Sequence, residues 1–167
     1  MLSKKMEKAL NAQINQEMES AYIYLSMSAY FADHSLNGFA HWMRMQYQEE
    51  LAHASKIIDY VLERDAKVSL TQIAAPPKSW SSTLSACQFA YKAEVKNTKQ
   101  INKLTDQAIN EPDHATRVFL EWFVSEQIEE ESSAMDLVDQ VKLAGNAPGA
   151  IFILDRELGG RTPEEAQ

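Results

Sequence analysis

Several polar side chains lie where amphipathic helices should carry apolar ones. Glu17, Glu50 and Glu94 each interrupt a stripe of apolar residues that recur three or four positions apart. Gln127 and Glu130 interrupt a fourth stripe of the same kind. A buried carboxylate is unfavourable, and several buried together also repel one another, so a positive charge should lie among them. Because no Lys or Arg shares these stripes near their middles, the expected counter-charge is a metal ion.

The spacing of these residues predicts one shared site. Glu50 lies 33 residues after Glu17, and Gln127 lies 33 residues after Glu94, so two helical hairpins would hold them at the same register. Glu50 also begins a Glu-x-x-His motif that ends at His53, which places both side chains on one helical face. Glu-x-x-His alone recurs by chance. Together with single carboxylates from other helices, it is the pattern of di-iron carboxylate proteins.

The fourth stripe departs from a symmetric di-iron site. A symmetric site would carry a second Glu-x-x-His, whereas this chain has Gln127-Ile-Glu-Glu130. The second metal therefore loses an imidazole and gains an amide at best. Such unequal ligands predict one firm site and one exchangeable site. That suits iron that is bound, oxidised and released better than a permanent di-iron cofactor.

Four long helices are needed to position these side chains. The periodicity predicts helices at about residues 3–33, 36–64, 83–110 and 113–144, then a short helix at about 148–158 and a frayed tail at 159–167. Ser3 and Asp113 are the expected N-caps, and Gly145 should end the fourth helix. The intervening segment 67–82 contains a Pro-Pro pair and is long enough to cross the length of a bundle. We therefore predict one all-α domain over 1–167: a ferritin-like four-helix bundle of two antiparallel hairpins joined by a long crossover, plus a short C-terminal helix.

The composition limits the possible partners. A formal net charge of −8 over 167 residues argues against nucleic acid or an anionic membrane as the main partner. No stretch approaches the roughly 20 apolar residues of a membrane span, and the first ten residues lack the apolar core of a secretory signal. The single cysteine, Cys87, permits no intrachain disulfide and is expected to be a small buried hydrophobe. These features predict a cytoplasmic protein.

With these motifs in place, the chain resembles the non-haem ferritins of the prokaryotic type over nearly its whole length. The resemblance rests on Glu17, Tyr24, Glu94 and two motifs, QEELAH (residues 48–53) and SEQIEEE (residues 125–131). It implies a homo-oligomeric hollow shell of 24 subunits. Each subunit would oxidise Fe(II) with O₂ or peroxide, and the shell would store a ferric oxyhydroxide core.

The resemblance also implies a set of iron ligands. Glu17, Glu50 and His53 would hold the first iron, with Glu50 bridging to the second. Glu94 would hold the second iron, with Gln127 nearby. Glu130 adds a carboxylate, and prokaryotic ferritins use extra carboxylates for a third iron site. Here that site would comprise Glu49, Glu126, Glu129 and Glu130.

Other residues near the site have two interpretations each. Tyr24 lies seven residues after Glu17, so it should lie beside the irons, either with a redox role or as an ordinary core tyrosine. Leu51 stands where bacterioferritins carry a haem-ligating Met, so no haem is expected. Arg117 and Leu120 stand where animal ferritins line a threefold channel with acidic residues, so that route for iron is not carried over. Capping or surface positions are expected for three histidines (His34, His41, His114), and solvated ones for Glu121 and Glu131.

Two other functions remain as alternatives. One is a fixed-cofactor di-iron oxidase or peroxide reductase of the bacterioferritin or rubrerythrin kind. The absence of a Glu-x-x-His motif within the fourth helix and of any Cys-x-x-Cys electron-transfer motif counts against it. The other is a helical scaffold without chemistry, which the predicted buried carboxylates disfavour.

Overall fold

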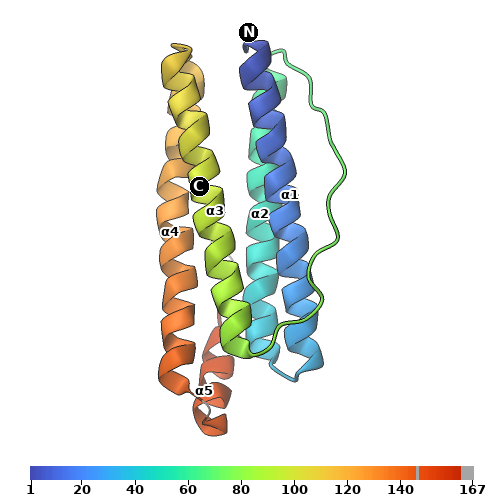
Figure 1. Cartoon of the computed structure of the whole chain (residues 1–167), viewed down its shortest axis with the longest axis vertical. Coiled ribbons are helices and arrows are strands. Elements are labelled where there is room, and N and C mark those ends of the chain that lie inside the picture. The colour runs from blue at the N-terminus through green and yellow to red at the C-terminus, as the bar shows by residue number, and fades with distance from the viewer. Residues whose placement is uncertain (146, 163–167) are drawn as a thin grey trace.

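The computed structural model describes residues 1–145 and 147–162, and these form five helices and no strand. Helices α1 and α2 form one antiparallel hairpin, and α3 and α4 form a second beside it (Figure 1). The crossover from α2 to α3 runs along the outside of the bundle from one end to the other (Figure 1). This confirms the predicted fold class. The observed bounds are α1 Lys4–Asp33, α2 Asn37–Glu63, α3 Thr83–Asn110, α4 His114–Ala144 and α5 Pro148–Leu158.

Local capping explains where most of these helices begin and end. The Ser3 hydroxyl accepts a hydrogen bond from the Met6 amide at 3.0 Å, and the Asp113 carboxylate accepts one from the Thr116 amide at 3.1 Å. Gly145 closes α4 with a φ of 57°, a conformation that favours glycine. The described part of the predicted tail is 159–162, and the remainder lies outside the described residues.

Helix α2 receives its N-terminal cap from α5, far away in sequence. Its own N-cap residue, Leu36, has no side-chain hydrogen bond to offer. The Asp155 carboxylate instead accepts from the amides of Gly38 and Phe39 at 2.8 and 3.0 Å. A Cβ atom at Gly38 would lie 1.5 Å from the Asp155 carbonyl oxygen, so only glycine lets α5 approach this closely.

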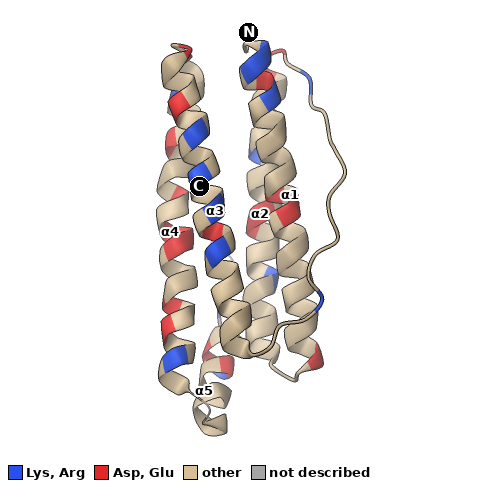
Figure 2. Cartoon of the chain, viewed as in Figure 1, with Lys and Arg blue, Asp and Glu red and all other residues tan. Residues whose placement is uncertain are grey.

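The interior of the bundle has an apolar cluster toward each end and a polar layer between them. One cluster includes Phe31, Phe39 and Val138, and the other includes Leu10, Ile57 and Leu120. Figure 2 shows acidic residues near the middle of the four long helices, at the level between these clusters. The buried polar side chains are Gln13, Gln16, Glu17, Ser20, Gln46, Glu50, His53, Glu94, Asn97, Thr116, Gln127 and Glu130.

One part of the predicted apolar stripe on α1 is only half-buried. Met18, Leu25 and Ser28 continue the three- and four-residue spacing of this stripe, but each is partly exposed. Tyr24, Met27 and Phe31 are buried instead. The buried positions Leu10, Glu17, Tyr24 and Phe31 repeat every seven residues, or 3.5 residues per turn, so the buried face drifts away from positions that recur every 3.6 residues.

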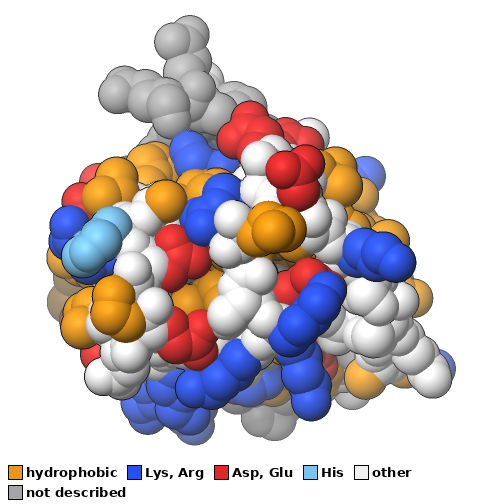
Figure 3. Space-filling view, turned by 90° about the horizontal axis from the view of Figure 1, so that it is seen from above, with side chains coloured by type: hydrophobic (Ala, Val, Ile, Leu, Met, Phe, Trp, Pro, Cys, Tyr) orange, Lys and Arg blue, Asp and Glu red, His pale blue; other side chains and the backbone are white. Residues whose placement is uncertain are grey.

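The two hairpins are tied together at the end of the bundle that carries the N-terminus. The Ser3 hydroxyl donates to Glu111, the Lys5 ammonium lies 3.3 Å from the same carboxylate, and Arg64 lies 3.3 Å from Asp113. The end-on view in Figure 3 shows the resulting mixture of acidic and basic side chains. Among the described residues, no helix is both long and apolar enough to cross a membrane.

Candidate metal centre

Three side chains from α1 and α2 converge at mid-bundle. Glu17, Glu50 and His53 each present a ligand atom within 4.8 Å of the other two, and all three are buried. The Glu50 carboxylate lies 3.7 Å from Nδ1 of His53. Two carboxylates and an imidazole are ligands that suit Fe(II). The Glu-x-x-His motif therefore forms the group that its helical spacing predicts.

The Glu50 carboxylate shows why this group should hold a cation. It is fully buried, and neither of its oxygens has a hydrogen-bond partner among the described residues. Burial, followed by repulsion from Glu94 and Glu17, raises its pKa well above the usual value for a glutamate. An ion bound between these oxygens and His53 would supply the missing partner and remove the repulsion.

Helices α3 and α4 supply two further buried carboxylates. Burial raises the pKa of Glu94 to about 7, although the Tyr24 hydroxyl opposes the rise by donating a hydrogen bond to Glu94. Burial and repulsion from Glu94 raise the pKa of Glu130 to about 8. One oxygen of Glu94 has no hydrogen-bond partner among the described residues. Both carboxyls therefore hold protons near neutral pH that a bound cation would displace.

Tyr24 lies beside the site, as predicted, and its hydroxyl is also satisfied. It is buried, it donates to Glu94, and burial raises its pKa well above the usual value for a tyrosine. Its ring packs edge-on against Trp42 with the ring centroids 6.5 Å apart. This geometry fits both a tyrosine with a redox role and an ordinary core tyrosine, so the redox role stays a prediction.

Buried amides hold the Glu17 carboxylate in place. Gln13 donates to one Glu17 oxygen at 2.7 Å, and Asn97 donates to the other at 3.0 Å. Gln13 also donates to Asn97 at 2.7 Å, which joins α1 to α3. The sequence interpretation missed both amides. They could have been found by the criterion that singled out the glutamates, because Gln13 lies four residues before Glu17 and Asn97 three residues after Glu94.

The Gln127 amide faces α3 and is not part of the group formed by Glu17, Glu50 and His53. Its nitrogen donates to the Thr98 hydroxyl at 3.1 Å and to the Glu94 carbonyl oxygen at 3.4 Å. Its oxygen accepts from Asn97 at 3.4 Å. Gln127 therefore lies near the centre, where it was expected, but its polar atoms bind protein groups. Its role as an iron ligand stays a prediction.

Comparison with known proteins gives the family. Residues 7–144 match the family model described as a ferritin-like domain. The chain belongs to this ferritin family. It is 42% identical to a bacterial non-heme ferritin of Bacteroides fragilis (96% of this chain, 100% of the relative) and 38% identical to one of Campylobacter jejuni (95% of each). An open pore ferritin of Archaeoglobus fulgidus superposes with a TM-score of 0.96 at 48% identity, covering 97% of this chain and 100% of that one.

These relatives confirm the predicted resemblance to prokaryotic non-haem ferritins. Together with the carboxylate and histidine groups of the described residues, they support a role of this ferritin in iron binding and storage. They leave the number of irons and the chemistry at the site as predictions.

A second group of potential ligands shares His53 with the first. His53, Glu126 and Glu130 also present ligand atoms within 4.8 Å of one another, and the Glu126 carboxylate lies 3.8 Å from Nε2 of His53. Burial alone would lower the pKa of His53, but the carboxylates of Glu126, Glu17 and Glu130 outweigh it and raise the pKa. The bridging position of His53 between two groups was not predicted, since it requires α2 and α4 to be adjacent at this level.

The two remaining residues of the expected third site, Glu49 and Glu129, are not members of this second group. Glu129 is exposed, and Glu49 pairs with Arg161 at 3.0 Å. Glu121 is exposed as expected and pairs with Arg117 at 2.5 Å, whereas Glu131 is half-buried rather than solvated. The structure thus brings together two of the four carboxylates expected at the third site, Glu126 and Glu130, with an imidazole.

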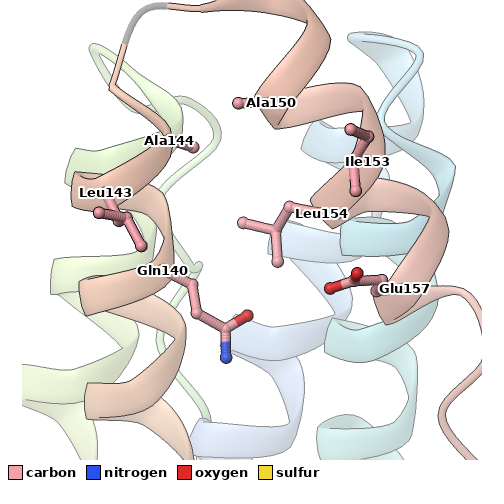
Figure 4. Close-up of a pocket in the computed structure, with 7 residues that line it drawn as sticks. All are labelled: Gln140, Leu143, Ala144, Ala150, Ile153, Leu154 and Glu157. Atoms are coloured by element: carbon pink, nitrogen blue, oxygen red, sulfur yellow. The ribbon is translucent and has the colours of Figure 1, made fainter.

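The other residues singled out in the sequence have ordinary surroundings. Burial raises the pKa of Cys87 to about 12, as suits a small hydrophobe, and His34 and His114 are exposed. The close-up in Figure 4 shows an open hollow of about 370 Å³ between the end of α4 and α5. It shares no residue with either group of potential ligands. Its lining is Gln140, Leu143, Ala144, Ala150, Ile153, Leu154 and Glu157.

Proposed function

We propose that this chain is an iron-storage ferroxidase. It oxidises Fe(II) to Fe(III) with O₂ or H₂O₂ at the buried carboxylate centre, and a hollow shell of its copies, 24 by family resemblance, stores the ferric oxyhydroxide. The observation that carries the proposal is Glu50, a buried carboxylate among Glu17, His53 and Glu94. Neither of its oxygens has a hydrogen-bond partner among the described residues. The bacterial non-heme ferritins at 42% and 38% identity support the assignment to storage.

Iron is the substrate, and the chain's residues prepare its binding. Glu17 is held ready by Gln13 and Asn97, and it ligates the first Fe(II) together with Glu50 and His53. The second Fe(II) binds on the side of Glu94 and Glu130, with Glu50 bridging to the first. Binding displaces the protons that burial keeps on these carboxyls.

The redox step needs no residue to change oxidation state. Each of two Fe(II) ions gives one electron to O₂, which takes up two protons and leaves as H₂O₂. With H₂O₂ as oxidant, the same two electrons and two protons break the O–O bond and give two waters. The carboxylate-rich ligand set favours the harder Fe(III) product and so drives the oxidation.

The group formed by His53, Glu126 and Glu130 accepts Fe(III) after it is formed at the first group. His53 belongs to both groups, so a metal can exchange ligands around it without leaving the protein. Three carboxylates of α4 differ in accessibility: Glu130 is buried, Glu126 is half-buried and Glu129 is exposed. Transfer from Glu130 to Glu126 therefore moves the product from the centre toward the surface of the bundle.

Aerobic Fe(II) addition tests the proposal, with absorbance followed in the near ultraviolet and the assembly measured by size-exclusion chromatography. The wild-type protein should oxidise several irons per chain quickly and elute as a very large shell. Glu50→Ala should lose the fast phase, and Glu121→Ala, which removes an exposed carboxylate, should keep it. An assembled shell that oxidises iron no faster than buffer would refute the ferroxidase. A monomer or dimer would refute storage.

A further inference from the structure

The segment after α5 places one arginine firmly on α2. The Arg161 guanidinium donates hydrogen bonds to the Gln46 side-chain oxygen and to both Glu49 oxygens, the latter at 3.1 and 3.0 Å. Its charge lies 5.0 Å from the centre of the Trp42 ring. His41 Nε2 lies 2.7 Å from the Arg161 carbonyl oxygen, and it must be the donor because a carbonyl only accepts. Four residues of α2 therefore fix this arginine.

The arginine reaches the buried centre through Gln46. This side chain is fully buried, and its nitrogen donates to Glu130 at 2.6 Å. Because an amide accepts only at its oxygen, the bond from Arg161 turns the nitrogen of Gln46 toward Glu130. Arg161 is therefore connected to the group formed by His53, Glu126 and Glu130 through a single side chain.

The same arginine engages a carboxylate that a third iron would need. Its two bonds to Glu49 form a bidentate, charge-assisted pair, and the side chains of Arg161 and Glu49 are 20% and 16% exposed. Solvent screens such a pair less than one on the open surface. The Glu49 charge acts on Glu130, so a cation bound at His53, Glu126 and Glu130 that took Glu49 as a further ligand would compete with the guanidinium for its oxygens.

We propose that Arg161 is a positioning residue that keeps Glu49 away from iron held by His53, Glu126 and Glu130. This inference rests on the proposed function. By occupying Glu49, the tethered cation leaves the second group with three ligands, so iron there stays exchangeable and can move on. Without Arg161 the group gains a fourth ligand, holds its metal more tightly and releases it more slowly.

Titration of the assembled, iron-free protein with Zn(II) tests this without any oxidation. Arg161→Gln removes the charge but keeps an N–H donor for Gln46. It should tighten the weaker Zn(II) binding step about two- to fivefold, as expected when a partly exposed ion pair stops competing. The tighter step should be unchanged. Arg161→Lys keeps the charge and should stay within about twofold of wild type. Arg156→Gln, the same change on the exposed face of α5, should have no effect.

A double-mutant comparison assigns the gain to Glu49. Glu49→Gln alone should change the weaker step little, because metal does not use Glu49 while Arg161 is present. In the double variant, Glu49→Gln should abolish the tighter Zn(II) binding that Arg161→Gln produces in the weaker step. The proposal is overturned if Arg161→Gln leaves the weaker step unchanged, if the gain survives in the double variant, or if Arg156→Gln produces the same gain.

Repeated aerobic Fe(II) additions separate this inference from the ferroxidase itself. Measured against its own first addition, Arg161→Gln should recover its fast phase before the second addition more slowly than the wild-type protein does. Recovery of the fast phase at the wild-type rate would refute the proposed role of Arg161. A wild-type protein without any fast phase would instead refute the proposed function, and the Zn(II) titration would still decide the role of Arg161.

Discussion

Metal binding to the buried centre should release protons in a strongly pH-dependent way. The pKa of Glu94 is about 7 and that of Glu130 is about 8. At pH 6 both carboxyls should therefore be mostly protonated, and at pH 8.5 both should be mostly ionised. Because ligand oxygens must lose their protons, Zn(II) binding should release about two protons from this pair at pH 6 and well under one at pH 8.5.

His53 should add to this release at the acidic end, since its pKa is also raised. Ionising Glu130 without a bound cation is unfavourable by several kcal/mol, because each pKa unit above the usual value corresponds to about 1.4 kcal/mol. Glu130→Gln keeps the shape of the side chain and removes this proton. The number of protons that this variant releases on Zn(II) binding should therefore be about one lower than for the wild type at pH 6, and little changed at pH 8.5.

Calorimetric titration with Zn(II) in buffers of different ionisation enthalpy counts the protons directly. The slope of the observed enthalpy against the ionisation enthalpy gives the number released. Glu121→Gln is the control, because Glu121 is exposed on the same helix. A release that is equal at pH 6 and pH 8.5, or that Glu130→Gln leaves unchanged, would refute the argument that burial keeps these carboxyls protonated.

Three further outcomes follow from the structure. Between the usual glutamate pKa of 4.5 and about 8, the folded, metal-free protein binds protons that the unfolded chain has lost, so its thermal unfolding midpoint should fall as the pH rises from about 5 to 8. Adding Zn(II) at pH 8 should raise the midpoint again. A midpoint that rises with pH over this range would contradict the assigned pKa directions. Asp155→Ala removes the cap of α2 and should lower the free energy of unfolding, measured by chemical denaturation, by about 0.5–2 kcal/mol. The control Glu157→Ala should lower it little, and equal losses in the two variants would exclude capping as the cause. Asn97→Leu removes a donor from Glu17 and should weaken the tighter Zn(II) step about 10- to 100-fold in calorimetry, so an unchanged affinity would show that the amide does not position the ligand.

The long helices could be predicted from sequence because their signals are local. Apolar residues three and four apart share a face in any α-helix, whatever packs against it. Ser3, Asp113 and Gly145 act on amides and carbonyls within a few residues of themselves, so their positions as caps could also be inferred from local sequence. The inward direction of Glu50 follows in the same way from its place on a stripe.

Other parts of the site depend on how the helices rotate and which neighbours they meet. Glu126 and Glu129 flank the same stripe of α4, yet Glu126 lies near His53 and Glu129 faces outward. Periodicity gives a helical face only to within a broad arc, and small rotations decide which flanking residue points in. The orientation of Gln127 is likewise set by Thr98 and Asn97 of α3.

The sequence by itself determined a four-helix bundle with a buried Glu17, Glu50, His53 and Glu94, because burial and helical period together leave those side chains no other direction. Only the tertiary structure decided that Asp155 caps α2 and that Arg161 holds Glu49, across separations of 117 and 112 residues. Such contacts depend on where α5 and the segment after it return against α2. No local pattern encodes that position, because it is set by close packing between distant parts of the chain.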